Sequence, residues 1–156
     1  MKKIMFVCHG NICRSPMAEY IMKDLVHKAG LDDEFHIESS ATSREEIGNG
    51  IYPPAVSVLL QHGINCKGHR ARQFTVADYN SFDLVVVMED YNLRNMLRII
   101  ACDCECKVWK LLDFTAPQLQ RTMGDDISDP WYHGNFDKTY KEILSGCKAL
   151  MKYLGY

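Results

Sequence analysis

The sequence predicts an α/β fold, a single doubly wound domain with a four-stranded parallel sheet and helices on both faces. Two observations support this prediction. Short apolar runs alternate along the chain with segments of helical periodicity, and this alternation favours right-handed crossovers between parallel strands. The chain has 156 residues, of which 47% are hydrophobic, which is the size of one domain with one core. We therefore expect residues 1–156 to form one domain.

The four predicted strands are apolar or alternating runs of five to seven residues. Continuous apolar runs of this length are typical of strands that are buried on both faces of a sheet. The most distinct run contains Leu-Val-Val-Val. In chain order the predicted strands are Lys2–Cys8, Phe35–Ser39, Asp83–Met88 and Lys107–Leu112.

The predicted helices follow from start signals, stop signals and apolar spacing. Ser15-Pro16 suits a helix N-cap followed by proline at the first helical position, and this helix should end near Gly30. Pro53-Pro54 opens a second helix that should end at Gly63. Periodic apolar residues predict two more helices, at Asn92–Ala101 and Phe136–Leu154.

One long segment, Asp113–Asp129, has little periodicity and predicts a surface loop. Long loops in compact domains are often functional. In doubly wound sheets, ligands bind beyond the carboxyl ends of the strands, often at the first strand-to-helix turn. Here that turn is Cys8–Ser15.

Composition excludes several classes of function. Eighteen Lys and Arg against twenty Asp and Glu give a net charge of −2, which disfavours nucleic acid as a partner. The N-terminal apolar run Ile4–Cys8 is too short for a signal peptide or a membrane span, so we expect a cytoplasmic protein without a membrane partner. Seven cysteines, an odd number, favour free thiols over a disulfide framework. The sequence leaves the oligomeric state open.

The turn Cys8-His9-Gly10-Asn11-Ile12-Cys13-Arg14-Ser15 has the composition of an anion-binding loop. Gly10 and Asn11 tolerate the left-handed backbone that a nest of inward-facing amides requires, and the following helix directs its positive dipole end at the loop. The same field stabilises a thiolate at Cys8. Arg14 supplies a planar fork for two phosphoryl oxygens. A nucleophile, an anion hole and a charge clamp are thus expected within eight residues, whereas the alternative is a buried cysteine before an ordinary capped helix.

Residues 7–19, Val-Cys-His-Gly-Asn-Ile-Cys-Arg-Ser-Pro-Met-Ala-Glu, resemble the signature of the low-molecular-weight protein tyrosine phosphatases. The resemblance continues through nearly the whole chain, at Ala55–Gly63, His69–Arg72, Phe82–Asn92 and Asp129–Tyr132. It implies hydrolysis of phosphomonoesters on tyrosine-phosphorylated proteins through a phosphocysteine intermediate, with no metal or other cofactor.

The resemblance also assigns roles to residues. It implies that Cys8 is the nucleophile, that Arg14 binds the phosphoryl oxygens, and that Asp129 is the general acid. A general acid is needed because a leaving tyrosine takes a proton, and Pro130 restricts the backbone of Asp129. The remaining positions form or brace the phosphate-binding loop: His9, Gly10, Asn11, Ile12, Cys13, Ser15, Ser39 and His69.

Three residues are expected at the substrate pocket. Trp131 and Tyr132 should line its mouth, where aromatic faces enclose a phenyl ring and the depth excludes phosphoserine and phosphothreonine. Many relatives have an aromatic residue on the opposite wall, where this sequence has Glu45. That departure concerns substrate preference and leaves the chemistry unchanged. Glu89 replaces a common Asp and is expected only to brace the structure.

Three other functions are weighed against the phosphotyrosine phosphatase. A thioredoxin-coupled arsenate reductase of this fold needs redox cysteines directly after the third strand, where this chain has Met88-Glu89-Asp90. A protein-arginine phosphatase carries threonine in place of Ile12. A non-enzymatic phosphotyrosine-binding module would lack the thiol, the arginine or the acid, and all three are present.

Two cysteine arrangements remain open at this stage. Cys13 is spaced to form a reversible disulfide with Cys8, with a small packed side chain as the equal alternative. Cys102-Asp103-Cys104-Glu105-Cys106 would present three thiols on one face if extended. Structural zinc sites prefer a different spacing, so no metal site is expected there.

Overall fold

A computed structural model describes all 156 residues. Its centre is a four-stranded sheet with strand order β2-β1-β3-β4, in which every neighbouring pair is parallel. The strands are β1 (Lys2–Cys8), β2 (Phe35–Ala41), β3 (Leu84–Val87) and β4 (Val108–Lys110). The predicted fold class is confirmed.

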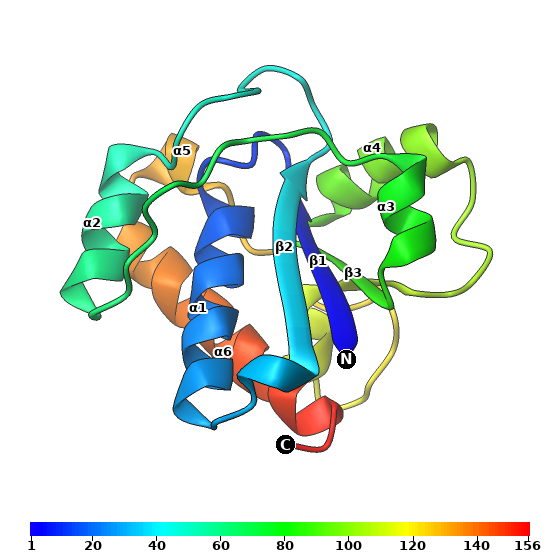
Figure 1. Ribbon diagram of the computed structural model, residues 1–156. Coiled ribbons are helices and arrows are strands. Elements are labelled where there is room, and N and C mark those ends of the chain that lie inside the picture. Colours follow the sequence, from blue (N-terminus) through cyan, green and yellow to red (C-terminus); the bar gives the residue numbers. More distant parts are fainter.

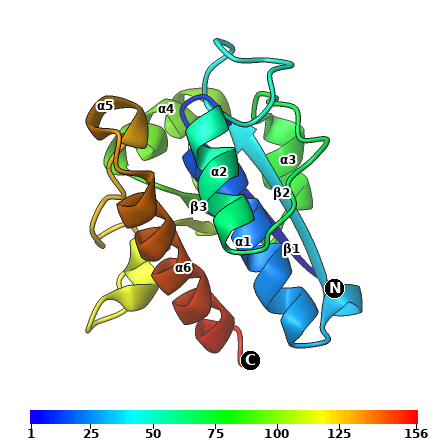
Figure 2. The same ribbon diagram turned by 90° about the vertical axis from the view of Figure 1, so that its left-hand side faces the viewer.

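Helices cover both faces of the sheet (Figures 1 and 2). One face packs against α1 (Arg14–Lys28), α2 (Pro53–Gln61) and α6 (Phe136–Tyr153), and the other against α3 (Val76–Ser81) and α4 (Asp90–Ile100). A short helix, α5 (Pro130–His133), precedes α6. Two 3-10 turns lie at Asp32–Glu34 and Leu111–Thr115. None of the helices is both long and apolar enough to cross a membrane.

Strand β1 carries the alternation that fills the two cores. Ile4 and Phe6 belong to the core beneath α1 and α6, whereas Met5 and Val7 belong to the core beneath α4. All four side chains are fully buried. Burial of successive residues on opposite faces is the reason that this strand reads as one unbroken apolar run.

Several predicted boundaries are wrong. Helix α1 begins at Arg14 with Cys13 at the N-cap position, so Ser15 is not the cap and Pro16 is the third helical residue. Strand β4 has only three residues, because the chain turns into the 3-10 helix at Leu111. Sequence patterns also missed α3 and α5.

The segment Asp113–Asp129 is only partly a surface loop. Asp113 and Ile127 are fully buried. The Asp113 carboxylate accepts hydrogen bonds from the amides of Lys110, Thr122 and Gly124, at 2.8, 2.7 and 2.6 Å. The amide of Ile127 donates to the carbonyl of Met88 at 2.8 Å. The loop is therefore fixed to the carboxyl end of β3.

The expectation of free thiols fails at one place. Cys102 and Cys104 are joined by a disulfide, and the segment Cys102–Cys106 forms a turn instead of the extended run that would align three thiols. Five cysteines are free: Cys8, Cys13, Cys66, Cys106 and Cys147. Sequence reasoning failed here because residues two apart rarely suggest a disulfide.

Candidate active site

The loop between β1 and α1 lies at the carboxyl end of the sheet and lines a cavity of about 390 Å³. The Cys8 side chain, 3% exposed, lies at the end of β1. Its Sγ accepts a hydrogen bond from the Asn11 amide at 3.3 Å and lies 3.1 Å from the Ser15 Oγ. An amide and a hydroxyl directed at one sulfur are suited to stabilise a thiolate.

Left-handed backbone occurs at one of the two expected loop positions. Asn11 has φ 58°, so the chain folds back there and its amide reaches the Cys8 sulfur. Gly10 does not have a positive φ. A Cβ at Gly10 would lie 3.3 Å from Cγ of Glu46, so the glycine instead permits close approach of a neighbouring segment.

Polar side chains behind the loop hold Asn11. Its Nδ2 donates to Ser15 Oγ at 2.8 Å and to Ser39 Oγ at 2.9 Å. Its carbonyl accepts from His69 Nε2 at 2.8 Å, and its Oδ1 accepts from the Arg72 amide at 3.2 Å. The expected network of Asn11, Ser39 and His69 is therefore present, with Arg72 as an additional member.

A hydrogen bond from Asn11 orients the Ser15 hydroxyl. Because Asn11 Nδ2 donates into the Ser15 oxygen, the hydroxyl proton remains available for the Cys8 sulfur at 3.1 Å or for the Ser40 carbonyl at 3.3 Å. Ser15, which the sequence suggested as a helix N-cap, therefore contacts the Cys8 sulfur instead.

Arg14 is 1% exposed and is held by three groups from other segments. Its Nη1 donates to the Ile127 carbonyl at 2.9 Å and lies 3.1 Å from Glu89 Oε1, while its Nη2 lies 3.3 Å from Asp129 Oδ2. Burial alone would lower the pKa of Arg14, but the negative charges at Cys8, Glu89 and Asp129 outweigh it and raise that pKa. The guanidinium is therefore a fixed cation at the cavity.

Asp129 reaches the cavity from the long loop. Its Oδ1 accepts from the Trp131 amide at 3.0 Å and caps α5, while its Oδ2 faces Arg14. Pro130 is the first residue of α5. The Asp-Pro pair thus begins a helix whose cap is the carboxylate itself.

The cavity mouth contains the three expected pocket residues and two others. Trp131 is 53% exposed, and Tyr132 is 85% exposed. Trp131 packs against Tyr52 with ring centroids 4.7 Å apart. Glu45 Oε2 lies 3.0 Å from His9 Nε2, which places its charge beside the loop. Tyr91 and Glu46 complete the mouth, and the Tyr91 ring lies 5.7 Å from that of His9.

Cys13 is buried beside Cys8 and free. Burial, followed by the negative charge at Cys8, raises the pKa of its thiol, so it is a neutral group at physiological pH. The Cys8–Cys13 disulfide, which the spacing allows, is not formed in this structure.

Sequence reasoning underrated or missed some supporting residues. Glu89, which was expected to serve structure only, pairs directly with Arg14. Glu19 accepts from the Ser39 hydroxyl at 2.5 Å, and the Arg72 amide donates to Asn11. Glu19 lies four residues after Ser15, on the same face of α1, and this spacing is the one signal that could have identified it.

Comparison with known proteins adds an independent line of evidence. The sequence model of the family described as "Low molecular weight phosphotyrosine protein phosphatase" matches residues 3–156. A protein of that name from Sus scrofa is 38% identical, over 97% of this chain and 94% of its own. The Bacillus subtilis low molecular weight protein-tyrosine-phosphatase YfkJ is 33% identical, over 97% of this chain and 94% of its own.

Solved structures agree with the sequence comparison. The crystal structure of YfkJ from Bacillus subtilis superposes with a TM-score of 0.91 at 32% identity, covering 99% of this chain and 94% of that one. The low molecular weight protein tyrosine phosphatase SP-PTP from Streptococcus pyogenes has a TM-score of 0.85 at 36% identity, covering 100% of this chain and 95% of that one. Together with the cavity formed by the β1–α1 loop, these matches show that the chain belongs to the low molecular weight phosphotyrosine protein phosphatase family.

Proposed function

We propose that this phosphatase hydrolyses phosphotyrosine with Cys8 as nucleophile, Arg14 as phosphate clamp and Asp129 as general acid. The observation that supports this most strongly is the pair of contacts to the Cys8 sulfur, from the Asn11 amide and the Ser15 hydroxyl, in a cavity that also contains a buried guanidinium. We treat residues 1–156 as one phosphatase domain that acts on tyrosine-phosphorylated proteins. We also propose a cytoplasmic location, because five of the seven cysteines are free thiols although Cys102 and Cys104 are bonded.

In the first step, the Cys8 thiolate attacks phosphorus and the bond between phosphorus and the phenolic oxygen breaks. The protonated Asp129 transfers its proton to the departing oxygen, so that tyrosine leaves as a neutral phenol. Arg14 and the loop amides bind the equatorial oxygens, whose charge is dispersed in the transition state. Glu89 and the Ile127 carbonyl keep the guanidinium in place.

In the second step, water attacks the phosphocysteine. The Asp129 carboxylate takes a proton from this water, the bond between sulfur and phosphorus breaks, and inorganic phosphate leaves. The electron pair returns to Cys8 as a thiolate. The Ser15 hydroxyl, 3.1 Å away, donates to this sulfur and so makes it a better leaving group.

The aromatic mouth supports phosphotyrosine as the substrate. Trp131, Tyr132 and Tyr91 are exposed and line the same cavity as the buried Cys8 at the end of β1. A phenyl ring that enters this cavity would lie with its flat faces against aromatic side chains and its phosphate toward Cys8. The half-buried Ile12 side chain adds an apolar wall, which suits a ring better than a guanidinium.

Peptides that differ only in the phosphorylated residue test this function. In the presence of a chelator, the enzyme should release phosphate from a phosphotyrosine peptide and leave the phosphoserine and phosphoarginine versions intact. Cys8→Ser should retain less than about a thousandth of the activity, a loss of roughly 4 kcal/mol in transition-state stabilisation. Comparable hydrolysis of phosphoarginine, or an active Cys8→Ser enzyme, would contradict the proposal.

A further inference from the structure

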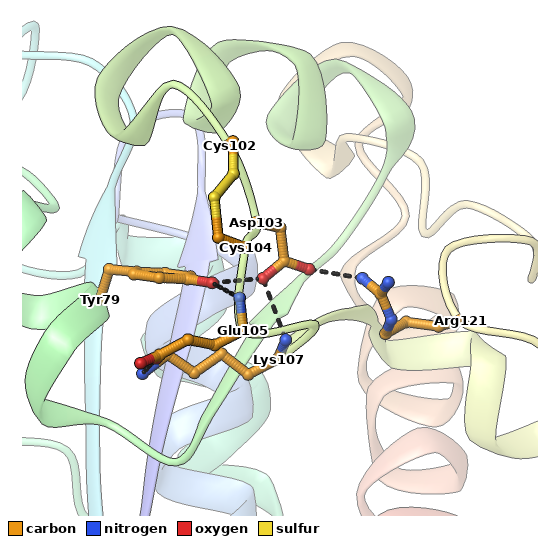
Figure 3. The surroundings of a disulfide bond; sticks show 7 residues. All are labelled: Tyr79, Cys102, Asp103, Cys104, Glu105, Lys107 and Arg121. Atoms are coloured by element: carbon orange, nitrogen blue, oxygen red, sulfur yellow. Dashed lines mark hydrogen bonds and ion pairs between the residues drawn. A yellow bond between two sulfur atoms is a disulfide. The ribbon is translucent and has the colours of Figure 1, made fainter.

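Three cysteines, Cys102, Cys104 and Cys106, lie away from the active site in the segment between α4 and β4. Figure 3 shows the first two of them. The phosphatase loop follows the carboxyl end of β1, whereas Cys102–Cys106 precede the amino end of the parallel strand β4. Because the strands are parallel, a loop that follows a strand and a loop that precedes a strand lie at opposite ends of the sheet. These cysteines therefore have no part in the phosphatase chemistry.

All three sulfur-bearing residues are exposed. Cys102 and Cys104 form the disulfide, with Cα atoms 5.3 Å apart, and Cys106 is a free thiol two residues further along. By contrast, the other four cysteines are buried and free. The disulfide and the one exposed thiol are thus in the same turn.

This disulfide is not suited to stabilise the fold. It joins residues two positions apart, and the stabilisation that a cross-link gives through the unfolded chain decreases as the closed loop becomes shorter. Both cysteines lie on the surface, so the bond does not staple two parts of a core. An exposed disulfide with little structural contribution is of the reactive type.

The turn is held by Asp103 independently of the sulfur bond. The Asp103 carboxylate accepts hydrogen bonds from the Tyr79 hydroxyl at 2.6 Å and from the Lys107 amide at 3.0 Å, and it pairs with Arg121 (Figure 3). It also accepts a hydrogen bond from the Val108 amide at 3.1 Å. Glu105 donates its amide to the same Tyr79 hydroxyl at 3.0 Å. The backbone should therefore keep the cysteines adjacent after the disulfide is reduced.

A tight turn of the backbone brings Cys106 back toward Asp103. The Cys106 amide donates to the Asp103 carbonyl at 3.1 Å, and Cys106 has φ 54°. This tight turn returns Cys106 toward the residue that separates the two bonded cysteines. Cys104 and Cys106 have the same separation in sequence as Cys102 and Cys104.

We propose that Cys102, Cys104 and Cys106 form a surface thiol–disulfide exchange site that reacts with low-molecular-weight thiols and their disulfides. A small thiolate attacks the Cys102–Cys104 bond, forms a mixed disulfide with one cysteine and releases the other as a thiolate. A second small thiol then attacks the mixed disulfide. The protein ends with two thiols and the small thiol ends as its symmetrical disulfide, so two electrons and two protons pass from the small thiols to the protein.

The free cysteine allows the disulfide to move within the turn without an external oxidant. The Cys106 thiolate attacks the Cys104 sulfur, a Cys104–Cys106 bond forms, and Cys102 leaves as a thiolate. The number of disulfides is unchanged. The turn can therefore present either terminal thiol, Cys106 or Cys102, to a reaction partner.

One tryptic peptide reports the state of all three sulfurs, because Ile99–Lys107 lies between Arg98 and Lys107 and contains no other cleavage site. The folded protein is incubated with reduced and oxidised glutathione at a series of ratios, quenched with acid and alkylated with iodoacetamide. It is then digested with trypsin, and the mass of the peptide Ile99–Lys107 is measured by mass spectrometry. With excess oxidised glutathione the peptide should carry an internal disulfide, with the third cysteine either alkylated or joined to glutathione. With excess reduced glutathione it should carry three alkyl groups, and the change should reverse.

Two variants make the test specific. In Cys102→Ser, the disulfide should form between Cys104 and Cys106, and the oxidised peptide should carry no alkyl group. The buried Cys66 and Cys147 serve as internal controls and should remain thiols at every ratio. The series is repeated in Cys8→Ser, where the result should be the same, so a failure of the exchange site is distinguishable from a failure of the phosphatase mechanism.

Three results would overturn the proposal. A wild-type peptide that carries three alkyl groups even in oxidised glutathione would show that the turn forms no disulfide. A peptide that keeps its disulfide in excess reduced glutathione would show an inert bond. Two alkyl groups on oxidised Cys102→Ser would rule out transfer to Cys106.

Discussion

Lys110 gives the sharpest stability prediction, because it is a buried cation whose partners are exposed. Its side chain is 4% exposed, and its Nζ lies 3.1 Å from Asp90 Oδ1 and 2.7 Å from Asp126 Oδ1. The side chains of Asp90 and Asp126 are 55% and 45% exposed. Burial alone would lower the pKa of Lys110, but the two carboxylates outweigh it and raise that pKa. The buried ammonium of Lys110 therefore needs the two carboxylates to compensate its charge, whereas water can solvate the carboxylates without it.

The two sides of this cluster should respond unequally to neutralisation. Lys110→Met removes the buried charge and leaves two carboxylates that water can solvate. The loss should therefore be at most about 2 kcal/mol, which is about 1 kcal/mol for each pair with a solvated acid. Asp90→Asn combined with Asp126→Asn leaves the ammonium buried without an anion and should cost about 3 kcal/mol or more. Adding Lys110→Met to this double variant should restore stability.

Denaturant titration at neutral pH measures these differences. Free energies of unfolding come from linear extrapolation, with the slope compared between variants to check that the denatured state is unchanged. If Lys110→Met destabilises the protein more than the double asparagine variant, or if the combined variant is the least stable of all, the reasoning from unequal exposure is refuted.

Three further predictions concern the active site and its support. Asp129→Asn should slow hydrolysis of phenyl phosphate by about a hundred- to ten-thousandfold, and much less that of an aryl phosphate with an acidic phenol; equal losses on both would remove Asp129 as general acid. Arg14→Lys should reduce kcat severely, because a single ammonium does not replace the bidentate guanidinium. Wild-type kinetics in this variant would contradict the role of Arg14 in binding the phosphoryl oxygens. Burial alone would raise the pKa of Asp78, but hydrogen bonds from Arg72 hold that pKa below its usual value. The ion pair with Arg72 therefore stabilises the fold at neutral pH, and this stabilisation is lost as the pH falls below about 4. Asp78→Asn should therefore flatten the decline in unfolding free energy from about pH 5 to 3, and an unchanged decline would assign it to other acids.

The strands and the long helices could be predicted from the sequence because their burial leaves a repeating pattern. Strand β1 is apolar at every buried position, and α6 repeats its apolar residues along one face. Helix α3 has only six residues and one buried side chain, Tyr79, so it has no period to detect. Its real signal is the capping box formed by Thr75 and Asp78.

The β1–α1 loop could be predicted from the sequence as an anion-binding site because its residues are contiguous. Cys8, Arg14 and Ser15 lie within eight residues, and their chemistry can be read from their order. Glu89 could not be assigned in the same way. Its pairing with Arg14 depends on β1 and β3 being neighbours in the sheet, a fact of topology that no local spacing contains.

The cysteine turn shows a different limit. The sequence displays three cysteines at alternate positions, but the pattern does not state whether the chain is extended or turned there. The turn is set by Asp103, whose partners include Tyr79 and Arg121 from distant segments. Long-range hydrogen bonds therefore decide which sulfurs meet.

Trapping the phosphoenzyme tests the central claim most directly. The enzyme is mixed with phosphotyrosine substrate, quenched with acid within the first turnovers, and digested, and the peptide that contains Cys8 is weighed and fragmented. The mechanism predicts a phosphoryl group on the Cys8 sulfur that is absent from Cys13 and from the Cys8→Ser protein. Turnover with no phosphoryl group on Cys8, or with the group on another residue, would contradict covalent catalysis by this cysteine.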